Sequence, residues 1–250
     1  AARPLQANAP GPLVACAGAY DGVAAAPHLS VAAAATAAAC GASIVMHCGT
    51  TLGPKNGVTQ ADVLAALGGP ERPDRSQSER MLEGCGVTLV YTPAVLPGWE
   101  RLAHIRDEVG VRGPLHAAER LLAYFGARRF VVGFTHSPYS GRLLGALQRL
   151  GAERAAAVRG IEGSDVLRPG RPVAIDFSGP LALPEDFGQR VEPEGGAEAS
   201  AEMTRAVLSG QENGAMARAV AISAATRLYV AGLVSVPRHG IAEAQAALAD

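Results

Sequence analysis

The sequence has no long apolar run and no large excess of either charge. The stretch Val31–Cys40 is apolar but short and mostly alanine, whereas a membrane-spanning helix needs roughly 20 apolar residues. The formal net charge is −1, which gives no overall attraction to nucleic acid or acidic lipid. We therefore expect no membrane span, and any affinity for nucleic acid would have to come from a local basic patch.

Cysteine is scarce, and no pair of cysteines has the CxxC spacing of a metal or redox site. Each of the four lies in or beside an apolar run, which favours buried free thiols over a metal site or a disulfide framework. Free thiols are typical of a reducing compartment. The cysteines are Cys16, Cys40, Cys48 and Cys85.

What the chain does contain is a regular alternation of apolar and amphipathic segments. Strands are predicted at 13–17, 43–48, 87–93, 129–136, 154–160 and 171–179. Helices are predicted at 28–40, 59–68, 76–86, 98–110, 114–125, 140–151, 200–210, 213–232 and 240–250. This order is typical of an α/β fold with a single, mainly parallel sheet and helices on both faces. We expect one such domain over residues 13–250, after an irregular tail at 1–12.

In a parallel sheet the ligand crevice lies beyond the carboxyl ends of the strands. Gly18 and Gly22 follow the first strand and would let the backbone approach a phosphate, although glycines are also common in ordinary turns. His47, at the end of the second strand, is either a ligand contact or a core histidine. Lys55 lies in a polar loop where we expect it to be solvated.

Two acidic residues follow the fifth strand in the loop "RGIEGSD". Glu162 and Asp165 are three residues apart, close enough to share a Mg²⁺ together with water molecules. The alternative is that both carboxylates are simply solvated, as acidic residues in glycine loops usually are. The sequence alone leaves both interpretations open.

The order of these segments resembles anthranilate phosphoribosyltransferases and their wider nucleoside-phosphorylase-like superfamily. The resemblance covers residues 13–242 and rests on "GAYDG", the alanine-rich helix, "VMHCG", "KNGVTQADVLAALGG", "RDEVGVRGP" and "RGIEGSD". The closest likeness is to divergent bacterial paralogues, in which a "GAYDG"-type loop, "HPP"-like residues (here His136-Ser137-Pro138) and a "GLEGS"-like loop recur. The resemblance implies transfer of ribose 5-phosphate from phosphoribosyl pyrophosphate to anthranilate, with Mg²⁺ carrying the pyrophosphate.

Several family positions are kept in this sequence, and the resemblance implies their roles. The family's glycine loop, GTGGDG, matches at Gly18, Asp21 and Gly22, and its NIST segment keeps only Ser30. Its KHGNR segment keeps only His47, with Lys55 near enough in sequence to replace the lost lysine. The arginine that holds anthranilate matches Arg106. Of the Asp-Glu metal pair, Asp165 remains, and Glu162 is the candidate for the second carboxylate.

The departures from the family pattern predict a weakened donor site. Ala19 and Tyr20 replace glycines, and Met46 and Thr50 replace a lysine and an arginine. We therefore expect a divergent family member with a degraded phosphoribosyl pyrophosphate site, a weakened Mg²⁺ site and an acceptor other than anthranilate. The family's N-terminal helical subdomain is expected to be absent or incomplete, since only twelve residues precede the first strand.

A second hypothesis comes from a branch of the same family that binds nucleic acid. In it, the chain is a catalytically silent member that binds DNA, RNA or a larger protein complex. The arginines that would line such a surface are interleaved with acidic residues, so dispersed surface charge is the alternative interpretation. They are Arg101, Arg106, Arg112, Arg120, Arg128, Arg129, Arg142 and Arg159. With free thiols and this resemblance, we expect a soluble protein of a bacterial cytoplasm or a plastid stroma.

Overall fold

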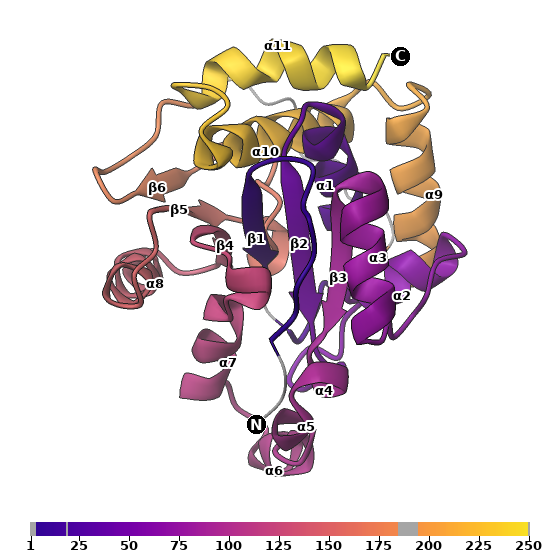
Figure 1. Ribbon diagram of the computed structural model, residues 1–250, viewed down its shortest axis with the longest axis vertical. Coiled ribbons are helices and arrows are strands. Elements are labelled where there is room, and N and C mark those ends of the chain that lie inside the picture. The colour runs from indigo at the N-terminus through magenta and orange to yellow at the C-terminus, as the bar shows by residue number, and fades with distance from the viewer. Residues whose placement is uncertain (1–3, 19, 185–194, 250) are drawn as a thin grey trace.

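The computed structural model describes residues 4–18, 20–184 and 195–249, which are built around a six-stranded sheet (Figure 1). The strand order is β3-β2-β1-β4-β5-β6. The first five strands are parallel, and β6 runs antiparallel to β5 at the edge. The strands are β1 (Leu13–Ala17), β2 (Ser43–Cys48), β3 (Val87–Tyr91), β4 (Arg129–Phe134), β5 (Arg154–Arg159) and β6 (Ala174–Asp176).

Helices cover both faces of this sheet, as the sequence predicted. Alternate residues of a strand point to opposite faces. In β1, Val14 and Cys16 join the larger apolar cluster under α1 (Ser30–Ala39) and α10 (Ala215–Ala231). Ala15 faces the other way, toward the cluster under α8 (Pro138–Arg149). On that same face α3 (Arg75–Cys85) packs through Leu82 against the middle of β2 and β3.

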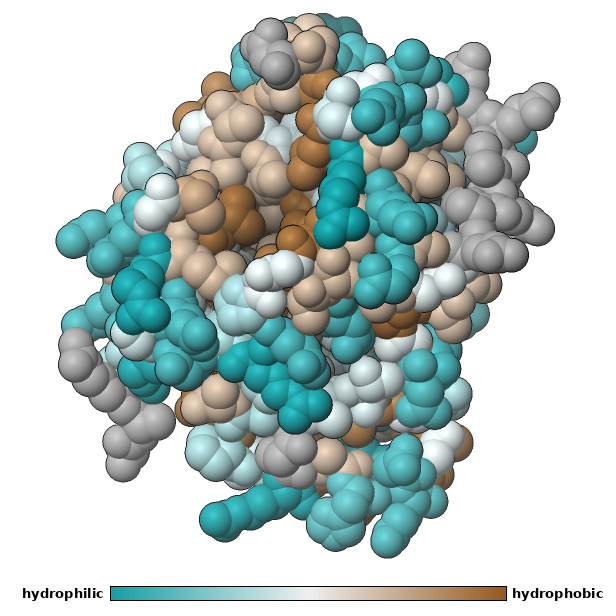
Figure 2. Space-filling model, turned by 90° about the vertical axis from the view of Figure 1, so that its right-hand side faces the viewer, coloured by the Kyte–Doolittle hydropathy of each residue, from teal (hydrophilic) through white to brown (hydrophobic). Residues whose placement is uncertain are grey.

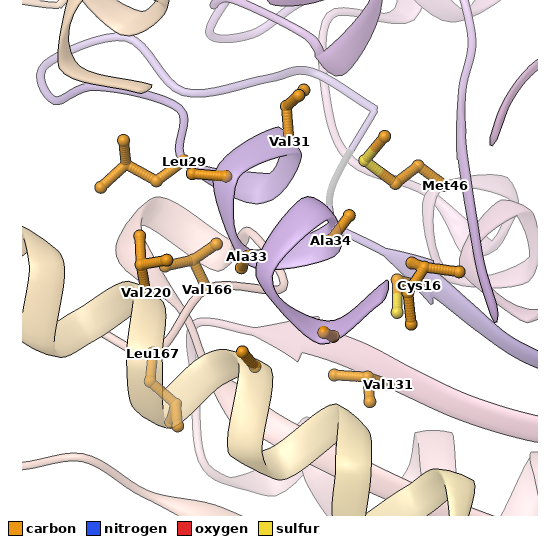
Figure 3. Packing of buried hydrophobic residues seen from close by; sticks show 14 of the residues in the cluster. Cys16, Leu29, Val31, Ala33, Ala34, Met46, Val131, Val166, Leu167 and Val220 are labelled. Carbon is orange, nitrogen blue, oxygen red and sulfur yellow. The ribbon is translucent and has the colours of Figure 1, made fainter. Parts of the chain in front are cut away.

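The alanine-rich helix α1 lies at the centre of the larger cluster. Its small side chains face Val131 of β4, Val166 and Leu167 of the loop after β5, and Val220 of α10 (Figure 3). Alanine suits this position because it favours helix and lets neighbouring backbones come close. The alanine bias of the sequence therefore reflects a buried helix between the sheet and α10.

The remaining long helices complete the cover of the α1 face. They are α2 (Gln60–Ala66), α9 (Ala197–Leu208) and α11 (Pro237–Ala247). Helix α2 begins where predicted, because Thr59 and Asp62 form a reciprocal capping box. The side of the molecule that carries α9, α2 and α3 in Figure 1 faces the viewer in Figure 2, where apolar residues are exposed in the upper half and hydrophilic ones over much of the rest.

Residues 92–126 differ from the prediction of two amphipathic helices at 98–110 and 114–125. The chain instead forms short pieces, because Pro97 and Pro114 each start a new helix and Gly110 ends one in the left-handed conformation. Phe125 also has a positive φ of 55°, which no helix continues through. The pieces are α4 (Thr92–Val95), α5 (Pro97–Glu100), α6 (Ala103–Val109), α7 (Pro114–Ala118), η1 (Glu119–Leu121) and η2 (Tyr124–Gly126).

Three further predictions need correction. Strand β6 spans three residues rather than 171–179, because Pro172 and Pro180 cannot donate ladder hydrogen bonds. All four cysteines are free, but Cys85 is exposed at the end of α3 and Cys40 is half-buried. No helix within the described ranges is long and apolar enough to cross a membrane. Residues 4–12 form no helix or strand and run beside α3, with backbone N–H groups of Gln6 and Asn8 donating to its glutamates.

Candidate functional site

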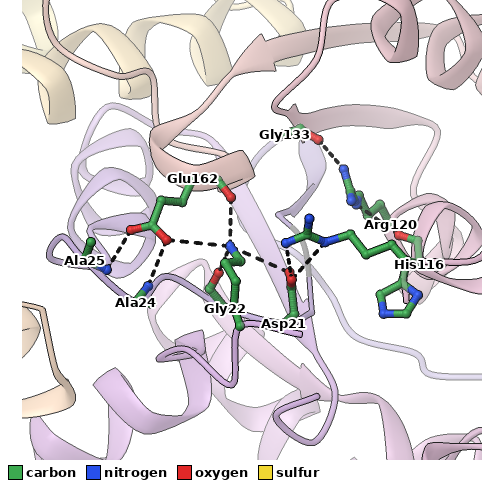
Figure 4. Close-up of polar contacts among 10 residues, drawn as sticks. Asp21, Gly22, Ala24, Ala25, His116, Arg120, Gly133 and Glu162 are labelled. Carbon is green, nitrogen blue, oxygen red and sulfur yellow. Dashed lines mark hydrogen bonds and ion pairs between the residues drawn. The ribbon is translucent and has the colours of Figure 1, made fainter. Parts of the chain in front are cut away.

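The loops that follow the parallel strands meet at one edge of the sheet, and Asp21 is the acidic centre of that edge. Its carboxylate is fully buried and accepts hydrogen bonds from Arg112, whose Nε lies 2.9 Å from Oδ2. The Lys55 ammonium lies 3.7 Å from Oδ1. Two cations from separate loops therefore neutralise one carboxylate next to the glycine loop (Figure 4). Ala19, the other departure in this loop, lies outside the described residues.

Lys55 is a tethered cation rather than the solvated side chain that the sequence predicted. Only 18% of its side chain is exposed. Its ammonium donates to the carbonyl oxygens of Gly22 and of Glu162, the latter at 2.9 Å. Burial lowers the pKa of Lys55, and the charges of Asp21 and Glu162 oppose that shift. Lys55 thus bonds the loop after β1 to the loop after β5.

Glu162 closes the same set of contacts from the other side. Its two carboxylate oxygens accept the backbone N–H of Ala24 at 3.1 Å and of Ala25 at 2.8 Å, and Oε2 lies 3.9 Å from Lys55 Nζ (Figure 4). The residue has a left-handed backbone with a φ of 50°, which is uncommon for any residue other than glycine. Asp21, Gly22, Lys55 and Glu162 are therefore brought together.

Asp165 lies apart from that group, in the interior of the protein. Its two oxygens accept hydrogen bonds from the Ser30 hydroxyl and from Arg227 Nη2, the latter at 2.5 Å. Asp165, Ser30 and Arg227 are all fully buried. The structure thus brings Ser30 and Asp165 together, as the resemblance implied, but around an arginine of α10 that the sequence analysis did not name.

His47 belongs to a third, separate cluster. Its Nδ1 lies 2.6 Å from the Tyr20 hydroxyl, which lies 2.8 Å from Thr92 Oγ1. The hydroxyl of Tyr124 donates to the same threonine at 3.0 Å. Burial lowers the pKa of His47 to about 4, so the ring is neutral at pH 7. Tyr20 therefore fills the space beside β2, and a Cβ on Gly49 would come within 2.9 Å of its ring.

Gly18 serves the packing of two loops. A Cβ built on it would lie 2.7 Å from Ser164 Cα, in the loop after β5, which is closer than a real Cβ can approach. A side chain at Gly18 would push that loop away from the sheet. The glycine that the sequence analysis assigned to phosphate approach therefore makes room for the chain itself.

Arg106 is engaged with a buried carboxylate. Its Nη1 lies 2.8 Å from Glu119 Oε2, and the two side chains are 6% and 0% exposed. Burial raises the pKa of Glu119, and Arg106 opposes the shift. The neighbouring Arg120 donates to Gly133 O at 2.8 Å and to His116 O at 3.1 Å (Figure 4).

The other arginines of the proposed basic surface are also largely engaged within the chain. Arg128 and Arg129 pair with Glu153 at 3.1 and 3.7 Å, and Arg142 lies over the ring of Tyr139. With Arg106 on Glu119 and Arg112 on Asp21, four of the eight arginines have a carboxylate partner. These pairs reduce the positive charge available to a nucleic acid.

Sequence analysis missed three residues that hold the site together. Arg227 carried a signal, because it is the last charge in a predicted helix that is otherwise apolar on every side around it. Arg112 and Glu119 carried none, since their partners lie 91 and 13 residues away in the chain. Helical or strand periodicity does not report on pairs of this kind.

Known proteins similar to this chain belong to one family. Residues 21–175 match the family described as "Glycosyl transferase family, a/b domain". An anthranilate phosphoribosyltransferase of Rubrobacter xylanophilus is 32% identical over 232 residues, covering 88% of this chain and 67% of the relative. One of the Thermus thermophilus proteins is 31% identical, covering 89% and 69%.

Solved structures agree with these sequence matches. The crystal structure of anthranilate phosphoribosyltransferase from Thermus thermophilus superposes with a TM-score of 0.84 at 31% identity, covering 99% of this chain and 76% of that one. The Saccharomyces cerevisiae enzyme in complex with PRPP and Mg matches in fold, with a TM-score of 0.74 at 18% identity, covering 98% and 72%. The chain therefore belongs to the anthranilate phosphoribosyltransferase family of glycosyl transferases.

Proposed function

We propose that this chain is a divergent family member whose donor-binding groups are engaged with one another, so that it does not transfer phosphoribose to anthranilate at ordinary substrate levels. Any transfer that it does perform uses another acceptor. The observation that carries this proposal is the closed set of contacts among Asp21, Lys55, Arg112 and Glu162. These contacts span the loops where the family relatives would receive the donor.

The charge balance at this edge supports weak donor binding. Lys55 and Arg112 contribute two positive charges, and Asp21 and Glu162 contribute two negative charges. A pyrophosphate would bring several more negative charges without a surplus of cations to receive them. Each lost charge-assisted contact is worth about 1.5–3 kcal/mol. Two such losses amount to several kcal/mol, or roughly 10²–10⁴-fold in affinity.

The carboxylates proposed for Mg²⁺ do not fit a metal site in this arrangement. Both oxygens of Asp165 accept hydrogen bonds in the interior, one of them from a guanidinium. Both oxygens of Glu162 accept backbone N–H groups. Over the described residues, no group of three or more His, Cys, Asp or Glu side chains is placed to hold a metal ion. We therefore assign no step of the chemistry to Mg²⁺ held by these two residues.

The acceptor side leads to the same proposal. Arg106, the position that the resemblance gives to anthranilate, is buried against Glu119. A carboxylate substrate would have to compete with that internal carboxylate and leave it buried without a partner, which costs several kcal/mol. Arg106 is therefore proposed to hold α6 and η1 together instead of binding anthranilate.

The test is a pair of measurements on the purified chain, run beside the Thermus thermophilus relative. Calorimetric titration with phosphoribosyl pyrophosphate and Mg²⁺ should give a Kd at least 100-fold weaker for this chain than for the relative. Anthranilate fluorescence should stay constant at substrate levels that the relative consumes. A parallel titration with single-stranded DNA and RNA examines the silent-binder hypothesis. Steady anthranilate consumption in proportion to protein concentration would contradict the proposal.

A further inference from the structure

Three hydrogen-bond donors converge on the carboxylate of Glu162. The backbone N–H groups of Ala24 and Ala25 donate to its two oxygens, and the Lys55 ammonium lies 3.9 Å from one of them (Figure 4). Adjacent main-chain N–H groups beside a cation form an arrangement that binds anions. Here the anion comes from the same chain, 137 residues further along.

Glu162 is attached in a way that lets it leave without opening the core. A quarter of its side chain is exposed. Its backbone has a φ of 50° and a ψ of 25°, and the next residue, Gly163, also has a positive φ. Non-glycine residues in this conformation often lie at functional sites where an element has more than one state. The buried neighbour of this segment, Asp165, is held separately by Arg227.

We propose that Glu162 is an internal anion, which occupies an oxyanion site formed by the N–H groups of Ala24 and Ala25 and by Lys55, and that an external phosphate group binds there only after Glu162 has left. The proposal rests on the proposed function, because it names the contact that must be given up before a phosphorylated ligand is bound. It makes Glu162 the residue that sets the affinity and specificity of this crevice for anions.

The charges around this oxyanion site favour a phosphate group as the external ligand. Without the Glu162 carboxylate, Lys55 and Arg112 exceed Asp21 by one positive charge. Arg112 binds Asp21 through Nε and Nη2, and its side chain is 43% exposed, so its third nitrogen, Nη1, takes no part in that pair. A phosphate has enough oxygens to accept two N–H groups and two cations together, whereas a carboxylate has only two oxygens.

The experiment compares phosphate binding by wild type, Glu162→Gln and Glu162→Gly at constant, low ionic strength. Glu162→Gln removes the charge at almost constant size, and Glu162→Gly removes the side chain at a backbone conformation that suits glycine. The matched control is Glu243→Gln, which removes an exposed glutamate of α11. The probes are inorganic phosphate and ribose 5-phosphate, titrated separately by calorimetry, with circular dichroism to verify folding.

We expect both Glu162 variants to bind at least one probe tenfold or more tightly than wild type, and Glu243→Gln to match wild type. Adding Lys55→Met to Glu162→Gln should remove the gain. Equal affinities in wild type and both Glu162 variants would overturn the proposal, as would an equal gain in Glu243→Gln. Because only relative phosphate affinities are compared, this result is independent of whether wild type turns over anthranilate, and the two proposals can fail separately.

Discussion

Replacing Asp165 by asparagine is expected to destabilise the protein rather than to remove a metal ligand. In the native protein the Asp165 carboxylate lies 2.5 Å from Arg227 Nη2, and both side chains are fully buried. The neutral amide leaves the guanidinium without a counter-charge where water does not reach. Arg227 keeps a hydrogen bond to Ser223 O at 2.9 Å, but that carbonyl carries no charge.

The expected loss is large because burial removes the screening that weakens surface pairs. Removing one partner of a buried ion pair costs about 3–5 kcal/mol, out of about 5–15 kcal/mol for a typical domain. Replacing both partners by apolar residues of similar size is often neutral. The double variant Asp165→Leu with Arg227→Met should therefore recover most of what either single variant loses.

Urea unfolding at pH 7, followed by circular dichroism, measures these free energies for Asp165→Asn, Arg227→Met and the double variant. Glu153→Gln is the matched control, since that carboxylate pairs with Arg128 at 3.1 Å but is 46% exposed. Loss of an exposed pair should change the free energy of unfolding by less than about 1 kcal/mol. The reasoning is refuted if Asp165→Asn keeps wild-type stability while abolishing a Mg²⁺-dependent rise in Tm.

Two further predictions concern buried polar groups. Burial lowers the pKa of His28 and of His47 to about 4; the unfolded chain, with histidine pKa values near 6.5, takes up protons first as pH falls. The stability present above pH 6.5 should therefore be lost between pH 6.5 and 4, by about 3 kcal/mol per histidine, and His47→Gln should make the measured pH dependence shallower; an unchanged slope would argue against a neutral buried ring. Tyr20→Phe removes the hydroxyl shared by His47 and Thr92 and should lower the free energy of unfolding by about 1–3 kcal/mol, whereas Tyr91→Phe, whose hydroxyl is only part-buried, should cost less in the same urea experiment.

The sequence by itself determined the frame of this protein. Continuous apolar runs such as Ser43–Cys48 predicted buried parallel strands, and the alanine-rich run predicted the buried helix α1. Local chemistry was sufficient where the partner is near in the chain, as at the Thr59 and Asp62 cap. Because parallel strands end at a common edge, the sequence also predicted which loops would meet there.

Only the tertiary structure decided what the charged residues of those loops contact. Asp165 met Arg227, 62 residues away, and Glu162 met the backbone of Ala25, 137 residues away. Residues 98–125 broke into short helices whose Arg106 and Glu119 pair in the interior. Periodicity reports which face of an element is buried, but the choice among possible charge partners depends on distances and burial that exist only after the chain has folded.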